Sequence, residues 1–171
     1  MKPFALLVIC FCCFLFGFSQ DTSRVEFVIR NIGIGVNGHF NKVRIDTKFD
    51  EDGHLLNIQG AIEVASIETG IDSRDEHLLK ATYFDVATHP TITLVSNGVT
   101  ETSEGVFKVD GVLTIKGKSK DISITVTRKN ENAKYIITSS FQINRRDYQV
   151  GGRSMAMSNK VKINVIHYHS L

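Results

Sequence analysis

Cysteine is confined to the start of the chain, where Cys10, Cys12 and Cys13 are the only three in the sequence. A domain that begins after this segment contains no thiol. Disulfide bonds, thiol catalysis and cysteine-ligated zinc are therefore excluded for it. We expect such a domain to be held together by its hydrophobic core alone.

A hydrophobic run of membrane-spanning length is also missing. The longest apolar run, residues 4–18, falls short of the roughly 18–20 residues that a transmembrane helix needs. Lys2 precedes this run, and Gly17 and Ser19 are the small residues that a signal-peptide cleavage site requires. The pattern predicts a secretory signal peptide. A retained membrane anchor is the alternative interpretation.

We therefore expect residues 1–20 to be removed and residues 21–171 to form a single domain that is periplasmic or secreted and has no transmembrane segment. Neither a tandem repeat nor a Pro/Gly linker divides this part of the chain. The formal net charge of +2 becomes +1 when Lys2 is removed with the signal peptide. Basic and acidic residues are interspersed, so we expect no electrostatic attraction to nucleic acid or to an anionic membrane.

Catalytic and metal-binding motifs are absent too. There is no nucleophile elbow and no His-Glu-x-x-His sequence. His167 and His169, two residues apart near the C-terminus, would make at best a weak metal site. Arg74, Asp75 and His77 form the tightest polar cluster, but no nucleophile or oxyanion-hole motif accompanies them. We expect a protein that is not an enzyme and that has no metal and no cofactor.

Alternating apolar residues predict an all-β fold, because about eight segments follow the two-residue period of a strand. Glycines interrupt the first segment at Gly33, Gly35 and Gly38, and Asn97-Gly98 reads as a turn. One short helix is expected after Gly70, with Asp72 or Ser73 as its N-cap, and it must dock on the sheet to be stable. The expected architecture is an eight-stranded antiparallel barrel with one inserted helix, and its strands are centred on residues 25–29, 43–45, 56–64, 92–94, 107–115, 122–126, 135–143 and 161–165.

The interior of this barrel is either a packed core or a ligand cavity, since alternation shows which way side chains point but not whether they touch. Gly60, Gly111 and Ser139 fall at inward positions and are the only sign of free space. Met155 and Met157 would either contact a ligand at the barrel mouth or pack within their loop. Nine apolar residues are expected to point inward and to line a tunnel if there is one: Ile58, Ile62, Ile92, Leu94, Leu113, Ile124, Ile137, Phe141 and Ile163.

Two polar groups of residues are candidates for binding the head group of such a ligand. Arginine can bind a phosphate through two hydrogen bonds, and the start of a helix favours an anion. The alternative is that these residues hold the loops in place. The candidates are Arg74, Asp75 and His77 near the helix start and Asn144 and Arg145 near the end of a late strand.

Six short motifs follow one another along the chain: Ser66-Ile67-x-Thr69, Arg74-Asp75-x-His77-Leu78, Tyr83-Phe84-Asp85, Pro90-x-Ile92 with Ser96, Gly111-Val112-Leu113-Thr114-Ile115-Lys116-Gly117 and Ile143-Asn144-Arg145-Arg146-Asp147-Tyr148. In this order they resemble the signature of the YceI-like, polyisoprenoid-binding family over nearly all of the chain after residue 23. One departure is Gln149, which stands where the family often has a small residue. The resemblance implies a lipocalin-like barrel that takes an isoprenoid or another long-chain amphiphile into an apolar tunnel.

Two hypotheses of different class follow. The first is a non-catalytic carrier whose ligand is an isoprenoid diphosphate, an isoprenoid quinone, a fatty acid or a fatty amide. The second is a filled barrel that acts as a protein-interaction module through the loops around Arg74 and Arg145. A homodimer is compatible with both, through an exposed strand edge or the loop around Met155.

Overall fold

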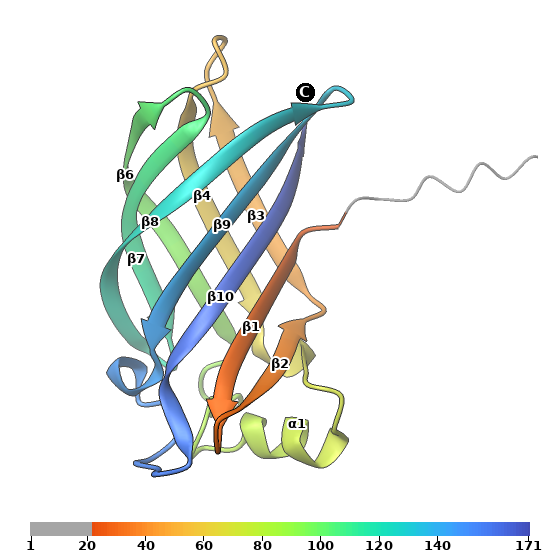
Figure 1. Cartoon of the computed structure of the whole chain (residues 1–171), viewed down its shortest axis with the longest axis vertical. Coiled ribbons are helices and arrows are strands. Elements are labelled where there is room, and N and C mark those ends of the chain that lie inside the picture. The colour runs from red at the N-terminus through yellow and green to blue at the C-terminus, as the bar shows by residue number, and fades with distance from the viewer. Residues whose placement is uncertain (1–21) are drawn as a thin grey trace, which may run out of the picture.

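A single ten-stranded antiparallel sheet forms the body of the protein and curls into a barrel-like shape (Figure 1). The computed structural model describes residues 22–171, so the predicted signal peptide lies outside the described residues. The elements, in chain order, are β1 (Arg24–Asn31), β2 (Ile34–Phe40), β3 (Val43–Phe49), β4 (Leu55–Glu63), the 3₁₀ helix η1 (Val64–Ser66), β5 (Ile67–Glu68), α1 (Asp72–Leu79), β6 (Thr91–Ser103), β7 (Val106–Ile115), β8 (Lys118–Glu131), β9 (Lys134–Asn144), the 3₁₀ helix η2 (Arg145–Tyr148) and β10 (Met157–Ser170).

The strands are neighbours in the order β3-β4-β6-β7-β8-β9-β10-β1-β2-β5. From β6 to β10 each strand pairs with the next along the chain, which makes an antiparallel meander. Strand β7 shows how the sequence produces this sheet, because Phe107, Val109, Leu113 and Ile115 alternate with less buried residues and all four are buried on the inner face. The expected all-β, barrel-like fold is confirmed.

The expected number of strands, eight, is too low by two. The strand β2 contains Gly35 and Gly38 and therefore lacks a regular apolar alternation, and β5 is only two residues long. Gly38 lies opposite Phe27 of β1, whose ring covers it so closely that a side chain would not fit. The glycines thus belong to a second strand of a hairpin and not to a bend in the first.

The turn expected at Asn97-Gly98 is also wrong. Strand β6 continues through these residues with a β-bulge, since Ser96 pairs with Gly111 while Gly98 pairs with Asp110. The chain instead turns at Gly105, which has a φ of 68°.

Helix α1 lies across one end of the barrel, which we call the helix end; the opposite end, with the β3–β4 turn, is the hairpin end (Figure 1). The N-cap is Ile71, and neither Asp72 nor Ser73 caps the helix as expected. Leu78 and Leu79 pack against the core, so the helix is stabilised by docking on the sheet, as its short length requires. None of the helices in residues 22–171 is long and apolar enough to cross a membrane.

The buried apolar residues form two clusters along the barrel. The cluster that packs with α1 consists of Val25, Phe40, Val64, Ile67, Ile92, Leu113, Ile115, Tyr148 and Val150. The second cluster consists of Leu55, Ile58, Phe107, Val109, Ile124, Val126 and Ile137.

The sheet is closed by side chains, since β3 pairs with β4 alone among the described strands. The Oγ1 atom of Thr47 on β3 lies 3.3 Å from Nε2 of His167 and 2.9 Å from Nδ1 of His169, both on β10. Ser23 binds the other ring nitrogen of His167 at 2.7 Å. We call this junction between β3 and β10 the seam.

Candidate functional site

An apolar cavity of about 260 Å³ lies inside the curled sheet. Its wall includes residues of nearly every strand, together with Leu78 of α1, Tyr148 of η2 and Val150. At the helix end it extends to Asn31, which is exposed to solvent, and to Arg74, which is half-buried. The cavity therefore runs from the middle of the barrel to the end that carries α1.

All nine residues that alternation assigns to the interior lie in the wall of this cavity. Ile58, Ile92, Leu113, Ile124 and Ile137 are buried. The other four, Ile62, Leu94, Phe141 and Ile163, are half-buried. The structure brings the whole set together, and the role of these residues as ligand contacts stays a prediction.

The three small inward residues contribute unequally to the free space. Gly60 and Ser139 line the cavity. Gly111 does not, because the bulge in β6 brings the backbone against it and a Cβ atom there would lie 2.6 Å from the carbonyl oxygen of Val95. Gly111 is needed for the close approach of two strands and not for ligand space.

Arg74 and Asp75 meet at Thr69, the residue that follows β5. Arg74 donates from Nε to the Thr69 hydroxyl and from Nη2 to the Thr69 carbonyl, both at 2.6 Å. The carboxylate of Asp75 accepts the backbone N–H of Thr69 at 3.1 Å and also the Thr69 hydroxyl. Arg74 lines the cavity, whereas Asp75 does not. This cluster holds the loop before α1 and places one cationic side chain at the cavity wall.

Arg145 is buried, with 3% of its surface exposed, and it also lines the cavity. Its guanidinium donates to the carbonyls of Ser158, Val150 and Gly152 at 2.9, 2.8 and 3.1 Å, and to Oδ1 of Asn159 at 3.2 Å. Burial, and secondly the charge of Arg146, lowers the pKa of Arg145. Its donors are therefore committed to the loop before β10 and to the first residues of β10, in a fork geometry that only arginine provides.

His77 and Asn144 lie away from the cavity wall. His77 is exposed, and its ring packs edge-on against Tyr83 at a centroid distance of 4.9 Å. Asn144 is exposed and accepts the backbone N–H of Arg146 at 3.1 Å, which caps η2. Both residues have evident structural roles.

The tyrosines of the cavity wall were missed by sequence reasoning, although both stand in motifs of the resemblance. Tyr148 is 2% exposed and lines the cavity beside Tyr83. Burial, and secondly the charge of Asp147, raises the pKa of Tyr148, so its hydroxyl stays protonated and can donate a hydrogen bond to a ligand. The signal that could have found it is an amphipathic aromatic residue next to a charged strand end.

Two further expectations concern histidines and methionines. His167 lines the cavity and His169 packs on Phe49 and Tyr135, so both rings are engaged in the seam. Met157 lines the cavity, whereas Met155 is fully exposed, so it neither lines the cavity nor packs within its loop.

A comparison with known protein families gives a match to the YceI-like domain over residues 16–166. The chain belongs to the YceI-like family. Curated relatives called UPF0312 protein include one from Vibrio cholerae, 31% identical over 108 residues that make up 60% of this chain and 55% of the relative. Another, from Azotobacter vinelandii, is 35% identical over 63 residues, 37% of this chain and 33% of the relative. The matched segment thus spans about a third to a half of these curated proteins.

Solved structures of YceI-like proteins share the fold. Burkholderia cenocepacia BcnA superposes with a TM-score of 0.81 at 25% identity, over 86% of this chain and 96% of that one. The Campylobacter jejuni YceI protein gives a TM-score of 0.75 at 22% identity, over 80% and 85%. A polyisoprenoid binding domain from Saccharophagus degradans gives 0.66 at 18% identity, over 87% and 94%.

Proposed function

We propose that this protein is a non-catalytic carrier of an isoprenoid or another long-chain amphiphilic lipid. The observation that carries the proposal is the apolar cavity inside the barrel. The description of the Saccharophagus degradans neighbour as a polyisoprenoid binding domain supports the same class of ligand.

The binding energy in this proposal comes from the lipid tail. Burial of hydrocarbon contributes about 0.8 kcal/mol per CH₂ group without any directional contact. The volume of about 260 Å³ lies just under the roughly 300–1,000 Å³ of typical ligand pockets.

The polar head group would lie at the helix end, where Arg74 and Tyr148 reach the cavity wall. Arg74 offers a cation and Tyr148 a hydroxyl donor, which together suit a phosphate, a carboxylate or a quinone oxygen. The donors of Arg145, the carboxylate of Asp75 and the amide of Asn144 are used by the protein's own backbone. Those three residues would act on the ligand through the loops that they hold.

The chain is proposed to work outside the cytoplasm, in the periplasm or secreted, after loss of residues 1–20, and without metal or cofactor. The alternative, an interaction module with a filled barrel, predicts an interior without free space. The cavity supports the carrier over this alternative.

Native mass spectrometry of the exported protein, followed by organic extraction and lipid identification, tests the proposal. We expect a stoichiometric adduct whose mass corresponds to a polyprenyl or acyl chain. A bare mass that persists after incubation with quinone, polyprenyl phosphate and fatty acid would overturn the carrier function.

A further inference from the structure

Two turns at the helix end expose apolar side chains to solvent. Ile32 lies in the β1–β2 turn and Ile34 follows it, and they are 77% and 71% exposed. Met155, in the loop before β10, is fully exposed. The backbone N–H of Ile32 donates to the carbonyl of Ala156 at 2.8 Å, so the turn and the loop are joined. We call Ile32, Ile34 and Met155 the apolar tip.

Ile32 is an unfavourable residue for its position. Its φ is 51° and that of Gly33 is 77°, the positive values that a two-residue hairpin turn of type I′ requires at both positions. Asparagine and glycine adopt this conformation readily, whereas a β-branched residue is strained in it. The chain therefore keeps an exposed, strained isoleucine where a polar residue would fold better, and such an outlier points to a function outside folding.

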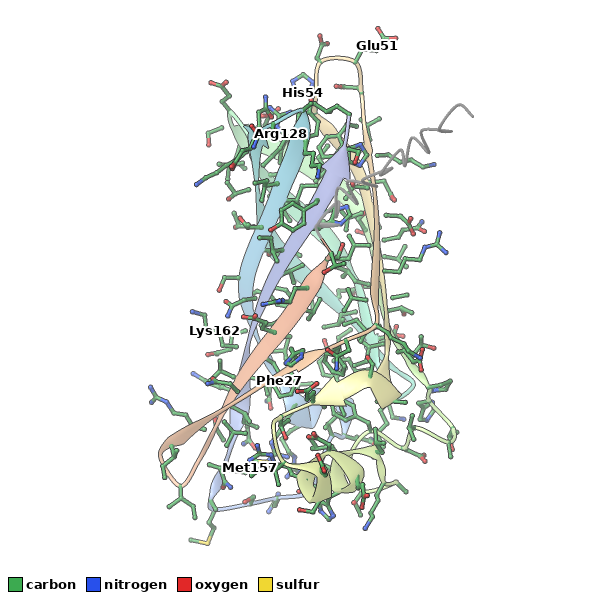
Figure 2. The ribbon with its side chains drawn as sticks, turned by 90° about the vertical axis from the view of Figure 1, so that its right-hand side faces the viewer. Phe27, Glu51, His54, Arg128, Met157 and Lys162 are labelled. Carbon is green, nitrogen blue, oxygen red and sulfur yellow. The ribbon has the colours of Figure 1, made fainter. Side chains whose placement is uncertain are left out.

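Basic residues lie on the two segments that carry the apolar tip. Residues 28–38 and 149–162 contain no acidic residue, and Arg30 and Arg153, which stand two residues from Ile32 and Met155, are exposed. The β3–β4 and β6–β7 turns at the hairpin end carry five acids, namely Asp50, Glu51, Asp52, Glu101 and Glu104, and Arg128 of β8 lies at the same end (Figure 2).

Figure 2 places Met157 near the helix end and Glu51, His54 and Arg128 at the opposite end. Asp72 and Glu76 of α1 and Asp147 of η2 lie at the helix end as well (Figure 1) and are exposed. A negatively charged surface would therefore be approached by the β1–β2 side of this end and not by the helix.

The cavity reaches the base of the same two segments. Asn31 and Met157 line the cavity and pair with each other in the sheet. Asn31 directly precedes Ile32, and Met157 follows Met155 by two residues. A hydrocarbon chain that left a bilayer at the apolar tip would have the cavity wall directly beside it.

We propose that the apolar tip docks on an anionic phospholipid bilayer, with Arg30 and Arg153 at the phosphate level. The proposal rests on the lipid-carrier function and adds the place where lipid enters. Single aliphatic side chains that project from turns among basic residues suit a fluid hydrocarbon boundary. A protein partner would more typically be met by a flat patch with aromatic anchors.

Vesicle flotation with the purified protein tests the docking surface. Vesicles made of equal parts phosphatidylcholine and phosphatidylglycerol should carry the protein, and vesicles of phosphatidylcholine alone should carry much less. The Ile32→Asn, Met155→Ser double variant should bind anionic vesicles roughly ten-fold more weakly or worse. Arg30→Gln and Arg153→Gln should each cost roughly five-fold, in a manner that added salt masks.

The control variant is Leu56→Ser, because Leu56 is 57% exposed on β4 and lies outside the apolar tip. It should float like the wild type. Ile32→Asn should also unfold at the same or a higher urea concentration than the wild type, which separates lost binding from lost folding. Equal flotation of the double variant and the wild type would overturn the proposal and leave a protein partner as the occupant of this surface.

The outcomes also separate docking from carrying. A wild-type protein that contains lipid but never binds anionic vesicles refutes the docking surface alone. A protein that binds vesicles through the apolar tip but never contains lipid supports docking and refutes the carrier function.

Discussion

Two arginines that look alike in the sequence have different tasks in the fold. Arg74 and Arg145 both stand near strand or helix ends in motifs of the YceI-like pattern, and both reach the cavity wall. The guanidinium of Arg145 donates to backbone carbonyls up to 13 positions away and to the side chain of Asn159, whereas that of Arg74 donates to Thr69, five positions away. Sequence reasoning could place both at the cavity but could not divide these roles, because most of the partners are backbone carbonyls that only the fold brings close.

Leu113→Trp should abolish lipid uptake while the protein stays folded. Leu113 is buried and lines the cavity, so an indole there would occupy space that a lipid tail needs. The measurement is the bound-lipid fraction by native mass spectrometry, with folding checked by circular dichroism. Val95→Trp, on an exposed position of β6, is the control and should retain lipid. Full lipid retention in folded Leu113→Trp would remove this residue from the binding wall.

Arg74→Ala should weaken binding of an anionic amphiphile more than binding of its neutral analogue. The expected difference is about 1.5–3 kcal/mol, the range of hydrogen bonds to charged groups. Thr69→Val is the control, since it removes the hydroxyl that binds Arg74 but keeps the charge. Thr69→Val should change the affinity for the anionic ligand and for its neutral analogue equally. Titration calorimetry with a fatty acid and the matching fatty alcohol measures both, and equal losses in Arg74→Ala would assign Arg74 to the fold.

Among the elements, long alternating strands could be predicted and short or glycine-rich ones could not. Strand β7 follows the two-residue period throughout, so its inward residues were identified correctly. Strand β2 could not be predicted, because Gly35 and Gly38 interrupt its apolar alternation. The ring of Phe27 fills the space where a side chain at Gly38 would lie. The bulge in β6 was mistaken for a turn because Asn-Gly is typical of turns, and only the pairing with β7 decides between them.

Arg145 organises the loop from η2 to β10, and its loss should destabilise that element strongly. Arg145→Met removes the donors of three buried or half-buried carbonyl contacts and should cost about 3 kcal/mol or more in the free energy of unfolding. Arg146→Met, at the neighbouring and more exposed position, should cost less than about 1 kcal/mol. Urea unfolding of both variants provides the comparison. Similar small losses would show that the loop does not depend on Arg145.

At the scale of the whole molecule, the curled sheet and its inward face could be predicted, but the free space inside could not. The nine inward residues are compatible with a packed core, and the cavity exists only because of how the strands curve around it. The apolar tip was likewise invisible, since Ile32 and Met155 lie far apart in the sequence and their segments are joined only in the fold.

The seam makes the stability of the barrel depend on pH. Burial, then the nearby charge of His169, lowers the pKa of His167 below its usual 6.5, with an opposing contribution from Asp46. The unfolded chain therefore takes up the proton first as the pH falls. The stabilisation that the neutral His167 contributes is complete above about pH 6.5 and is lost below it. The loss is about 1.4 kcal/mol for each unit by which the pKa of His167 in the folded protein lies below that in the unfolded chain.

Urea unfolding between about pH 7 and pH 5 tests this dependence. His167→Gln should flatten the decline in stability over this range. His54→Gln, at an exposed position, should leave the decline unchanged. An equal decline in the wild type and His167→Gln would assign the pH dependence to other groups.

At the seam, β3 pairs with β4 alone among the described strands, so the backbone groups along its other edge have no neighbouring strand. Such an edge invites another chain to extend the sheet, which is a common route to aggregation. Every second residue of β3 lies on the outer face, and these residues, Arg44, Asp46 and Lys48, are all charged and exposed. An incoming strand would have to settle against these charges. The charged outer face of β3 therefore disfavours the addition of another strand at this edge. This protection matters in a chain whose described residues contain no disulfide bond.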